Sequence, residues 1–325
     1  MKKTAIFLNG GAGRMISSIP AVEKYLEENP DKDPILVCEG GTDAFKGHPK
    51  LYFRAYDSWH KNLFQETLKD RELISPEPYR IWEYYNQKCS LAQAYDIAIN
   101  NKGIRDLPKP TIRLSKEELL MARKMIAEVK DKTGKNKIVV VQPFGRGAQP
   151  ENLTEKQMKE GKQPEITDVT GRSIELKNIW SIVRKLSKKY GVMMMSEFPL
   201  EFKNHMSAPV ATPMNVHIRI WMALIKQTNH FVGCDSVGQH LAYAFDGTAT
   251  VIIGSTYPIN TSFPDAENID IIDLGSEDRV YSPIRITSDE FSDRLNEGIM
   301  AMEDQAEDKV IKSVEKMLKQ SKNKQ

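Results

Sequence analysis

The segment from 229 to 258, NHFVGCDSVGQHLAYAFDGTATVIIGSTYP, constrains the fold of this chain more than any other stretch. Residues 230–233 are apolar enough for a buried strand, and residues 250–253 form a second such run. Between them Ser236 has the position of a helix N-cap. We expect Gly247 to end that helix by adopting a left-handed backbone conformation. Strand, loop, helix and strand in this order predict a parallel α/β sheet.

The loop between this strand and its helix is a candidate phosphate site. Ligands of parallel α/β sheets bind at the carboxyl ends of the strands, and a helix start offers free N–H groups and partial positive charge. Ser236 and Gly238 would let a phosphate oxygen approach the backbone. Asp235 has the same charge sign as phosphate, so it would accept bonds from sugar hydroxyls or hold the loop. His240 either donates to the ligand or is a packed, half-buried histidine.

The chain also opens with a strand and a glycine-rich turn. Residues 4–9 predict a buried strand, and a helix is expected over 17–28 with Ser18 as its cap. The glycines at 10–13 and Glu39, placed after a second strand over 35–38, are compatible with a dinucleotide fingerprint. Tyr84-x-x-x-Lys88 imitates the catalytic pair of sugar-nucleotide epimerases, but it precedes the fourth strand that such an enzyme needs.

The motif Asp-Ser-x-x-x-His at 235–240, then Leu-Ala-x-Ala and a strand ending Gly-Ser-Thr-x-Pro, resembles the heptosyltransferase-like glycosyltransferases, glycosyltransferase family nine. Val237 stands where that family usually has glycine. Residues 10–13 fit the family's opening glycine loop, and 17–21 fit the stretch after it. The family's aspartate, its proposed general base, is replaced by Arg14.

This resemblance implies a GT-B fold, in which two doubly wound Rossmann-like α/β domains face each other across a cleft. Residues 1–134 would bind the acceptor and residues 135–325 the nucleotide-sugar, with the last helix crossing back onto the first domain. A polar stretch over 131–137 predicts the boundary. Apolar periodicity predicts further helices over 115–130, 173–190 and within 288–319, and strands over 96–100, 137–141, 192–195 and 269–274.

The implied reaction moves a sugar from a nucleotide-sugar to an acceptor hydroxyl, with inversion, without a metal and without a further cofactor. The residues expected to bind the donor are Gly11, Gly13, Arg14, Arg146, Arg172, Glu201, Asp235, Ser236, Val237, Gly238 and His240. His240 would also stabilise the leaving diphosphate. Arginine cannot take a proton at neutral pH, so the base must be another group of the first domain. Asp43 is the first candidate, Glu39 the second, and Asp57 and His60 follow.

The acceptor surface is sought in residues 40–95, where aromatic and basic side chains are interleaved. Trp59, His60 and Trp82 are its candidates, because aromatic rings stack on sugars and bases; alternatively these aromatics pack inside a small helical insertion. The acceptor would be a lipopolysaccharide-type glycan or a modified DNA base. Two other functions stay open, an NAD-dependent sugar-nucleotide epimerase and a non-catalytic nucleotide-sugar-binding protein.

Composition agrees with a cytoplasmic protein of two domains. The chain has 325 residues and a net charge of +2, which gives no strong indication of nucleic-acid binding. Its three cysteines, Cys38, Cys89 and Cys234, are far apart and odd in number, which indicates a reducing compartment and no cysteine-based metal site. No apolar run approaches the roughly 18 residues of a membrane span, so we expect no integral membrane contact.

Overall fold

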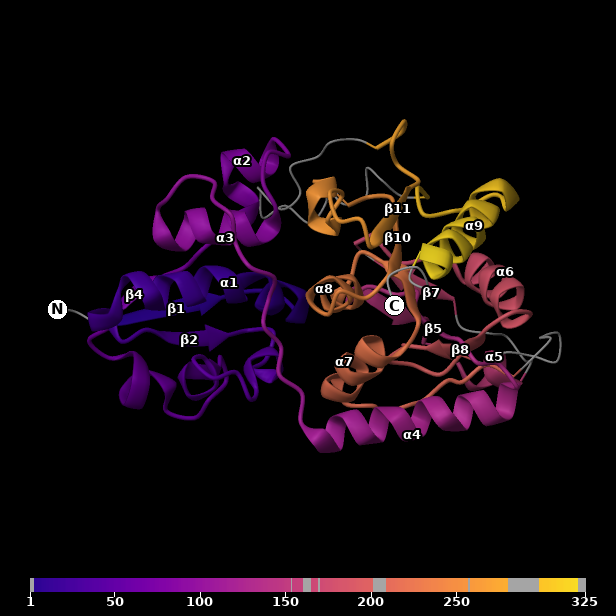
Figure 1. Cartoon of the computed structure of the whole chain (residues 1–325), viewed down its shortest axis with the longest axis horizontal. Coiled ribbons are helices and arrows are strands. Elements are labelled where there is room, and N and C mark those ends of the chain that lie inside the picture. Colours follow the sequence, from indigo (N-terminus) through magenta and orange to yellow (C-terminus); the bar gives the residue numbers. More distant parts are fainter. Residues whose placement is uncertain are drawn as a thin grey trace.

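The computed structural model describes residues 3–152, 154–159, 165–168, 170–200, 209–256, 258–279 and 298–320. Two parallel sheets lie side by side, with the helix α8 (Val237–Ala244) of the second packed against α1 (Ala12–Glu28) of the first (Figure 1). The central strands of both sheets are short, apolar and largely buried, as predicted for parallel α/β sheets, whereas the edge strands over 55–57, 72–74 and 269–273 are partly exposed.

The first sheet has the strand order β3-β2-β1-β4, and all its pairs are parallel. It is formed by β1 (Thr4–Leu8), β2 (Ile35–Cys38), β3 (Ala55–Asp57) and β4 (Glu72–Ile74). Helix α1 packs on α3 (Leu91–Asn100), and α2 (Trp82–Tyr85) lies before α3. Single helical turns occur at Pro30–Lys32, Asp43–Phe45, Tyr52–Arg54, Phe64–Leu68 and Pro78–Arg80.

Two sequence-based expectations for this half are wrong. Helix α1 begins at Ala12 and not at Ser17, because Gly11 adopts the extended conformation of an N-cap and its carbonyl accepts from the Arg14 amide. Ser18 therefore lies inside the helix, where its hydroxyl donates to the Met15 carbonyl. The strand expected over 96–100 belongs to α3, whose start is fixed by a reciprocal capping box between Ser90 and Gln93.

The second sheet has the order β11-β10-β9-β5-β8, again all parallel. Its strands are β5 (Ile138–Gln142), β8 (Gly191–Met194), β9 (His230–Cys234), β10 (Ala249–Ile253) and β11 (Ile269–Asp273). Alternate side chains of β5 enter two different cores: Ile138 and Val140 one, Val139 and Val141 the other. Helices therefore cover both faces, as in a doubly wound sheet.

A pair of helices packs on each face of this sheet. Helices α4 (Lys116–Thr133) and α7 (Ile218–Gln227) pack together on one face, and α6 (Leu176–Ser187) and α9 (Asp304–Gln320) on the other. The predicted helix over 115–130 is thus confirmed as α4, with Ser115 as its N-cap. Helix α9 packs on α6, β9, β10 and β11. That the last helix crosses back onto the first domain, and that the domain boundary lies near Gly134, stay predictions.

A small antiparallel pair lies apart from the two sheets. It joins β6 (Ala148–Pro150) to β7 (Ile166–Asp168), with α5 (Glu155–Lys159) between them in the chain. Across the described ranges, no helix is long and apolar enough to cross a membrane.

Candidate active site

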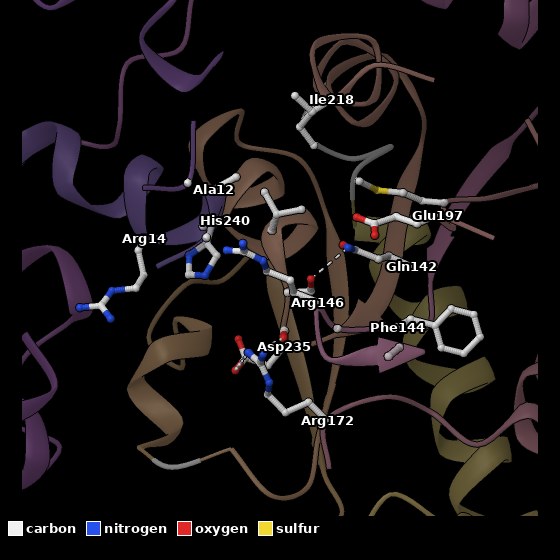
Figure 2. A pocket seen from close by; sticks show the side chains of 18 of the residues that line it. Ala12, Arg14, Gln142, Phe144, Arg146, Arg172, Glu197, Ile218, Asp235 and His240 are labelled. Atoms are coloured by element: carbon white, nitrogen blue, oxygen red, sulfur yellow. Dashed lines mark hydrogen bonds and ion pairs between the residues drawn. The ribbon is translucent and has the colours of Figure 1, made fainter. Parts of the chain in front are cut away.

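A cavity of 870 Å³ lies where the carboxyl ends of the two sheets face each other (Figure 2). The loop between β1 and α1 forms one wall, and the loops after β5 and β9 form the other. Most of the predicted donor residues line it: Gly11, Gly13, Arg14, Arg146, Arg172, Asp235, Ser236, Val237 and His240. Gly238 does not, and Glu201 lies outside the described residues.

Asp235 holds the loop that leads from β9 into α8. The residue is 3% exposed, and its two carboxylate oxygens accept bonds from Gln239 and from the Thr256 hydroxyl. Arg172 places Nη1 3.6 Å from Oδ2 of the same carboxylate. Among the two roles weighed for Asp235, this geometry corresponds to support of the loop.

Gln142, the last residue of β5, organises the start of α8. Its amide nitrogen donates to the Ser236 hydroxyl at 3.0 Å, and its amide oxygen accepts from the Gly238 N–H at 2.9 Å. Ser236 is thus at the N-cap position without capping the helix through its side chain, contrary to expectation. A Cβ on Gly238 would lie 2.2 Å from the Phe231 ring, so this glycine permits close packing of α8 on β9.

Two backbone amides at this helix start are left over. In the part of the chain that the structure describes, the N–H groups of Ser236 and Val237 have no hydrogen-bond partner, and both residues line the cavity. Unpaired amides at a helix N-terminus favour an anion. The predicted phosphate site therefore keeps two backbone donors, although Gly238 is not one of them.

His240 belongs to both walls of the cavity. It is 5% exposed, its Nδ1 lies 3.2 Å from Oγ of Ser17 in α1, and its ring meets Phe263 edge-on at 5.5 Å. A Cβ on Gly13 would lie 2.7 Å from His240 Cδ2, so the missing side chain makes room for the imidazole. His240 is therefore packed, as one interpretation had it, and also borders the cavity.

The end of α8 differs from expectation. Asp246, with φ of 56°, takes the left-handed conformation that was predicted for Gly247. An aspartate tolerates this region better than most residues, and the Gly247 N–H then bonds to the Ala242 carbonyl.

The three arginines at the cavity have different surroundings. Arg14 donates to the Tyr95 hydroxyl at 2.9 Å and to Glu77 at 3.0 Å, with its guanidinium 4.8 Å from the centre of the Tyr79 ring. Burial opposes the charge of Arg14, but these two tyrosines and Glu77 outweigh it and raise its pKa. In Figure 2 its guanidinium points away from His240.

Arg172 is also engaged, because it is paired with Asp235. Arg146, in contrast, has no hydrogen-bond or ion-pair partner among the described residues, and it reaches toward Gly11 on the opposite wall. Arg146 is thus the arginine of these three whose charge is not neutralised by a described carboxylate.

A second cavity of 450 Å³ adjoins the first and shares Gly11, Ala12, Gly40 and Arg146 with it. It is lined by Glu39, Asp43, Asp57 and Trp59. The Glu39 carboxylate accepts from the Gly10 N–H at 2.5 Å, and Asp43 Oδ1 lies 3.7 Å from His217 Nε2. The structure therefore brings three of the four predicted base candidates together with the predicted acceptor residue Trp59, whereas the fourth candidate, His60, is not among the described residues that line this cavity.

The other two acceptor candidates lie elsewhere. Among the described residues, neither His60 nor Trp82 lines either cavity; His60 meets Tyr56 edge-on, and Lys88 lies 4.3 Å from the centre of the Trp82 ring. The tyrosine of the epimerase-like pair also lies elsewhere: Tyr84 is fully buried, is bonded to Thr261 and is not among the described residues that line either cavity.

Several residues at the site carry no motif that would have identified them. Gln142 and Glu77 line the larger cavity, and Arg219, 3% exposed, binds Glu118 and the backbone carbonyls of Asp43 and Arg113. The position of Gln142 directly after a buried strand is a weak signal, whereas Glu77 and Arg219 offer none. Within the described residues, no group of three or more His, Cys, Asp or Glu is arranged to hold a metal ion.

Comparison with solved structures places the fold. Over 98% of both chains, the protein matches a glycosyltransferase of family 9 from Veillonella parvula DSM 2008, with a TM-score of 0.65 and 11% identity. It also matches the E. coli ADP-heptose lipopolysaccharide heptosyltransferase II, with a TM-score of 0.63 and 12% identity over 98% of this chain and 99% of the other. No family model and no curated protein matches the sequence. The predicted GT-B architecture is confirmed.

Proposed function

We propose that this protein is a glycosyltransferase that moves a sugar from a nucleotide-sugar to an acceptor hydroxyl, with inversion and without a metal. The observation that carries the proposal is the cavity itself. It places the start of α8, His240 and Arg146, whose side chain has no partner among the described residues, opposite a glycine loop, in a chain with the fold of family 9 glycosyltransferases.

The donor's diphosphate fits the second wall of the cavity. The amides of Ser236 and Val237, which have no partner in the described part of the chain, and the guanidinium of Arg146 offer donors and positive charge there. When the bond between sugar and phosphate breaks, negative charge grows on the leaving diphosphate, and prearranged donors stabilise it. His240 borders the same space. Asp235 and Gln142 contribute indirectly, because their hydrogen bonds hold the loop between β9 and α8 in place. Such a set supplies the charge stabilisation that a metal supplies in other enzymes.

The smaller cavity suits a carbohydrate acceptor better than DNA. Trp59 is 69% exposed and offers a stacking surface, and Glu39, Asp43 and Asp57 offer acceptors for sugar hydroxyls. The same three carboxylates would repel a phosphodiester backbone, with Arg146 as the one cation lining this cavity in the described structure. Under this proposal residues 1–134 bind the glycan and residues 135–325 the donor.

The NAD-dependent epimerase is the less supported function. Its catalytic tyrosine would be Tyr84, which is fully buried and bonded to Thr261. Its glycine loop would need room for a pyrophosphate, but the backbone at Gly40 lies close against that loop. A Cβ on Gly40 would lie 2.6 Å from the carbonyl oxygen of Gly10.

Ligand-induced thermal shifts test the proposal. The panel contains ADP, GDP, UDP and dTDP, their sugar conjugates including an ADP-heptose, and NAD. We expect one nucleoside diphosphate and its sugar to raise the melting temperature, since ligand at about a hundred times its Kd adds about 2.7 kcal/mol of stability. A shift with NAD alone would support the epimerase, and no shift with any member would contradict both.

A further inference from the structure

One carboxylate of the larger cavity has no role in the donor site described above. Glu77 follows β4, the strand that pairs in parallel with β1, so its loop lies beside the glycine loop after β1. Its side chain is 28% exposed and lines the cavity. Two other carboxylates of the described residues, Glu197 and Asp235, line this cavity, and both come from the second sheet's side.

Three donors hold the Glu77 carboxylate in place. Oε1 accepts from Arg14 Nη2 at 3.0 Å and from the Tyr79 N–H at 3.4 Å, and Oε2 accepts from Asn9 Nδ2 at 3.1 Å. A carboxylate has about four lone-pair sites. Three are occupied, and the remaining one is on Oε2, the oxygen that does not face Arg14.

Arg14 links this carboxylate to the residue that the resembled family uses as its base. It stands at the position where the resembled family has its aspartate base, and it cannot take a proton. Instead it reaches past Gly10 to Glu77, and its own position is fixed by Tyr79 and Tyr95. The charged side chain at position 14 thus positions a carboxylate that arrives from another loop of the same sheet.

The other carboxylates of this wall are less suitable. Glu39 is bonded to the Gly10 amide, and Asp43 lies beside His217 while its backbone carbonyl accepts from Arg219. Both line the smaller cavity and not the larger one that holds His240. Glu77 is the first-sheet carboxylate that shares the larger cavity with the donor wall in the described structure.

We infer that Glu77 is the general base of the transfer, moved from the start of α1 to the loop after β4 and held there by Arg14; this rests on the proposed glycosyltransferase function. The acceptor oxygen attacks the anomeric carbon as the bond from that carbon to the phosphate oxygen breaks. The diphosphate leaves with the bonding electron pair. The acceptor's proton passes to Oε2 of Glu77 and from there to solvent.

The test compares Glu77→Gln with the wild-type protein, using release of nucleoside diphosphate from the same panel of nucleotide-sugars with water as the acceptor. We expect the variant to bind the donor within about twofold of wild type and to turn it over about 100-fold or more slowly, as for loss of a general base. Glu66→Gln is the matched control, because Glu66 is an exposed carboxylate on the first domain that lines neither cavity.

A second variant separates catalysis from support. Glu77→Gln leaves the Arg14 charge without its partner, so the double change Arg14→Met with Glu77→Gln removes both charges. We expect it to regain thermal stability without regaining turnover. Normal turnover in Glu77→Gln, or recovery of turnover in the double variant, would show that Glu77 only supports Arg14. The same 100-fold loss in Asp43→Asn but not in Glu77→Gln would assign the base to Asp43.

Failure of the wild type is informative as well. A wild-type protein that binds none of the nucleotide-sugars contradicts the glycosyltransferase proposal itself. A wild-type protein that binds a donor and never releases its nucleotide contradicts Glu77 alone, because water reaches a cavity that is open to solvent and a base there would activate it.

Discussion

Ser17 Oγ lies 3.2 Å from His240 Nδ1, which joins the helix after β1 to the helix after β9. The two residues lie on helices that follow strands of different sheets, and their side chains are buried, at 3% and 5% exposed. If the two walls of the cavity move relative to each other, the hydrogen bond between Ser17 and His240 must either break or move with them. His240 therefore links the wall formed by the loops after β5 and β9, where the donor is proposed to bind, to the wall formed by the loop after β1.

His240→Ala should weaken binding of the nucleotide that stabilises the wild type, because the imidazole borders the cavity beside the proposed diphosphate site. Loss of the bond to Ser17 should also cost about 1–3 kcal/mol of folding stability, since a buried hydroxyl is left unpaired. Calorimetric titration and thermal unfolding measure the two effects. Ser17→Ala is the control that removes the hydrogen bond and keeps the imidazole; equal affinity in His240→Ala and wild type would leave a packing role for this histidine.

Gly13→Ala should disturb the same contact from the other side. The new Cβ would come within 2.7 Å of His240 Cδ2, a distance that forces the imidazole to shift. We expect lower donor turnover with a well-folded protein, as judged by circular dichroism. Gly103→Ala is the matched control, because a Cβ there meets nothing within 4 Å. Wild-type turnover in Gly13→Ala would show that the position of His240 is not critical.

Arg146→Met and Arg172→Met should differ in kind. Arg146 has no partner in the described structure, so its loss should weaken donor binding, more strongly at low than at high salt, with little change in stability. Arg172 neutralises the buried Asp235 carboxylate, so its loss should lower the melting temperature and affect binding through the loop. Titrations at two salt concentrations measure donor binding, and thermal unfolding measures stability. If Arg146→Met lowered stability and Arg172→Met weakened binding in a salt-dependent way, Arg172 would be the donor-binding arginine and Arg146 the structural one.

Asp168→Asn should make a pH-dependent difference to stability. Burial alone would raise the pKa of Asp168, but bonds from Ser173 and Thr170 outweigh it and lower the pKa from 3.8. A carboxyl whose pKa is lower in the folded state stabilises the fold above its unfolded pKa, and this contribution is lost as pH falls through the folded pKa. The stability gap between wild type and Asp168→Asn should be about 1–3 kcal/mol at pH 7 and shrink below about pH 3.8. Urea unfolding at pH 7 and pH 3 measures it, and a constant gap would contradict this account.

The sequence by itself determined the parts of the protein that depend on near neighbours in the chain. The run of apolar and β-branched residues over 230–233, a polar loop and a second run over 250–253 predicted β9, α8 and β10 correctly, and the second-half motif predicted the GT-B fold. The helix predicted over 115–130 from its apolar spacing is likewise found as α4, which begins with a capping box between Ser115 and Glu118. Such signals are readable because capping and burial on one face are set by residues one to four positions apart.

Tertiary structure decided which of the polar side chains meet. Arg14 and Glu77 are 63 residues apart and Gln142 and Ser236 are 94 apart, and each pair meets because strands that are distant in sequence are neighbours in a sheet. The same packing buries Tyr84, gathers Glu39, Asp43 and Asp57 around one cavity, and leaves Arg146 without a partner among the described residues. No local pattern contains this information, because it arises from the order of strands in the two sheets and from the way the sheets face each other.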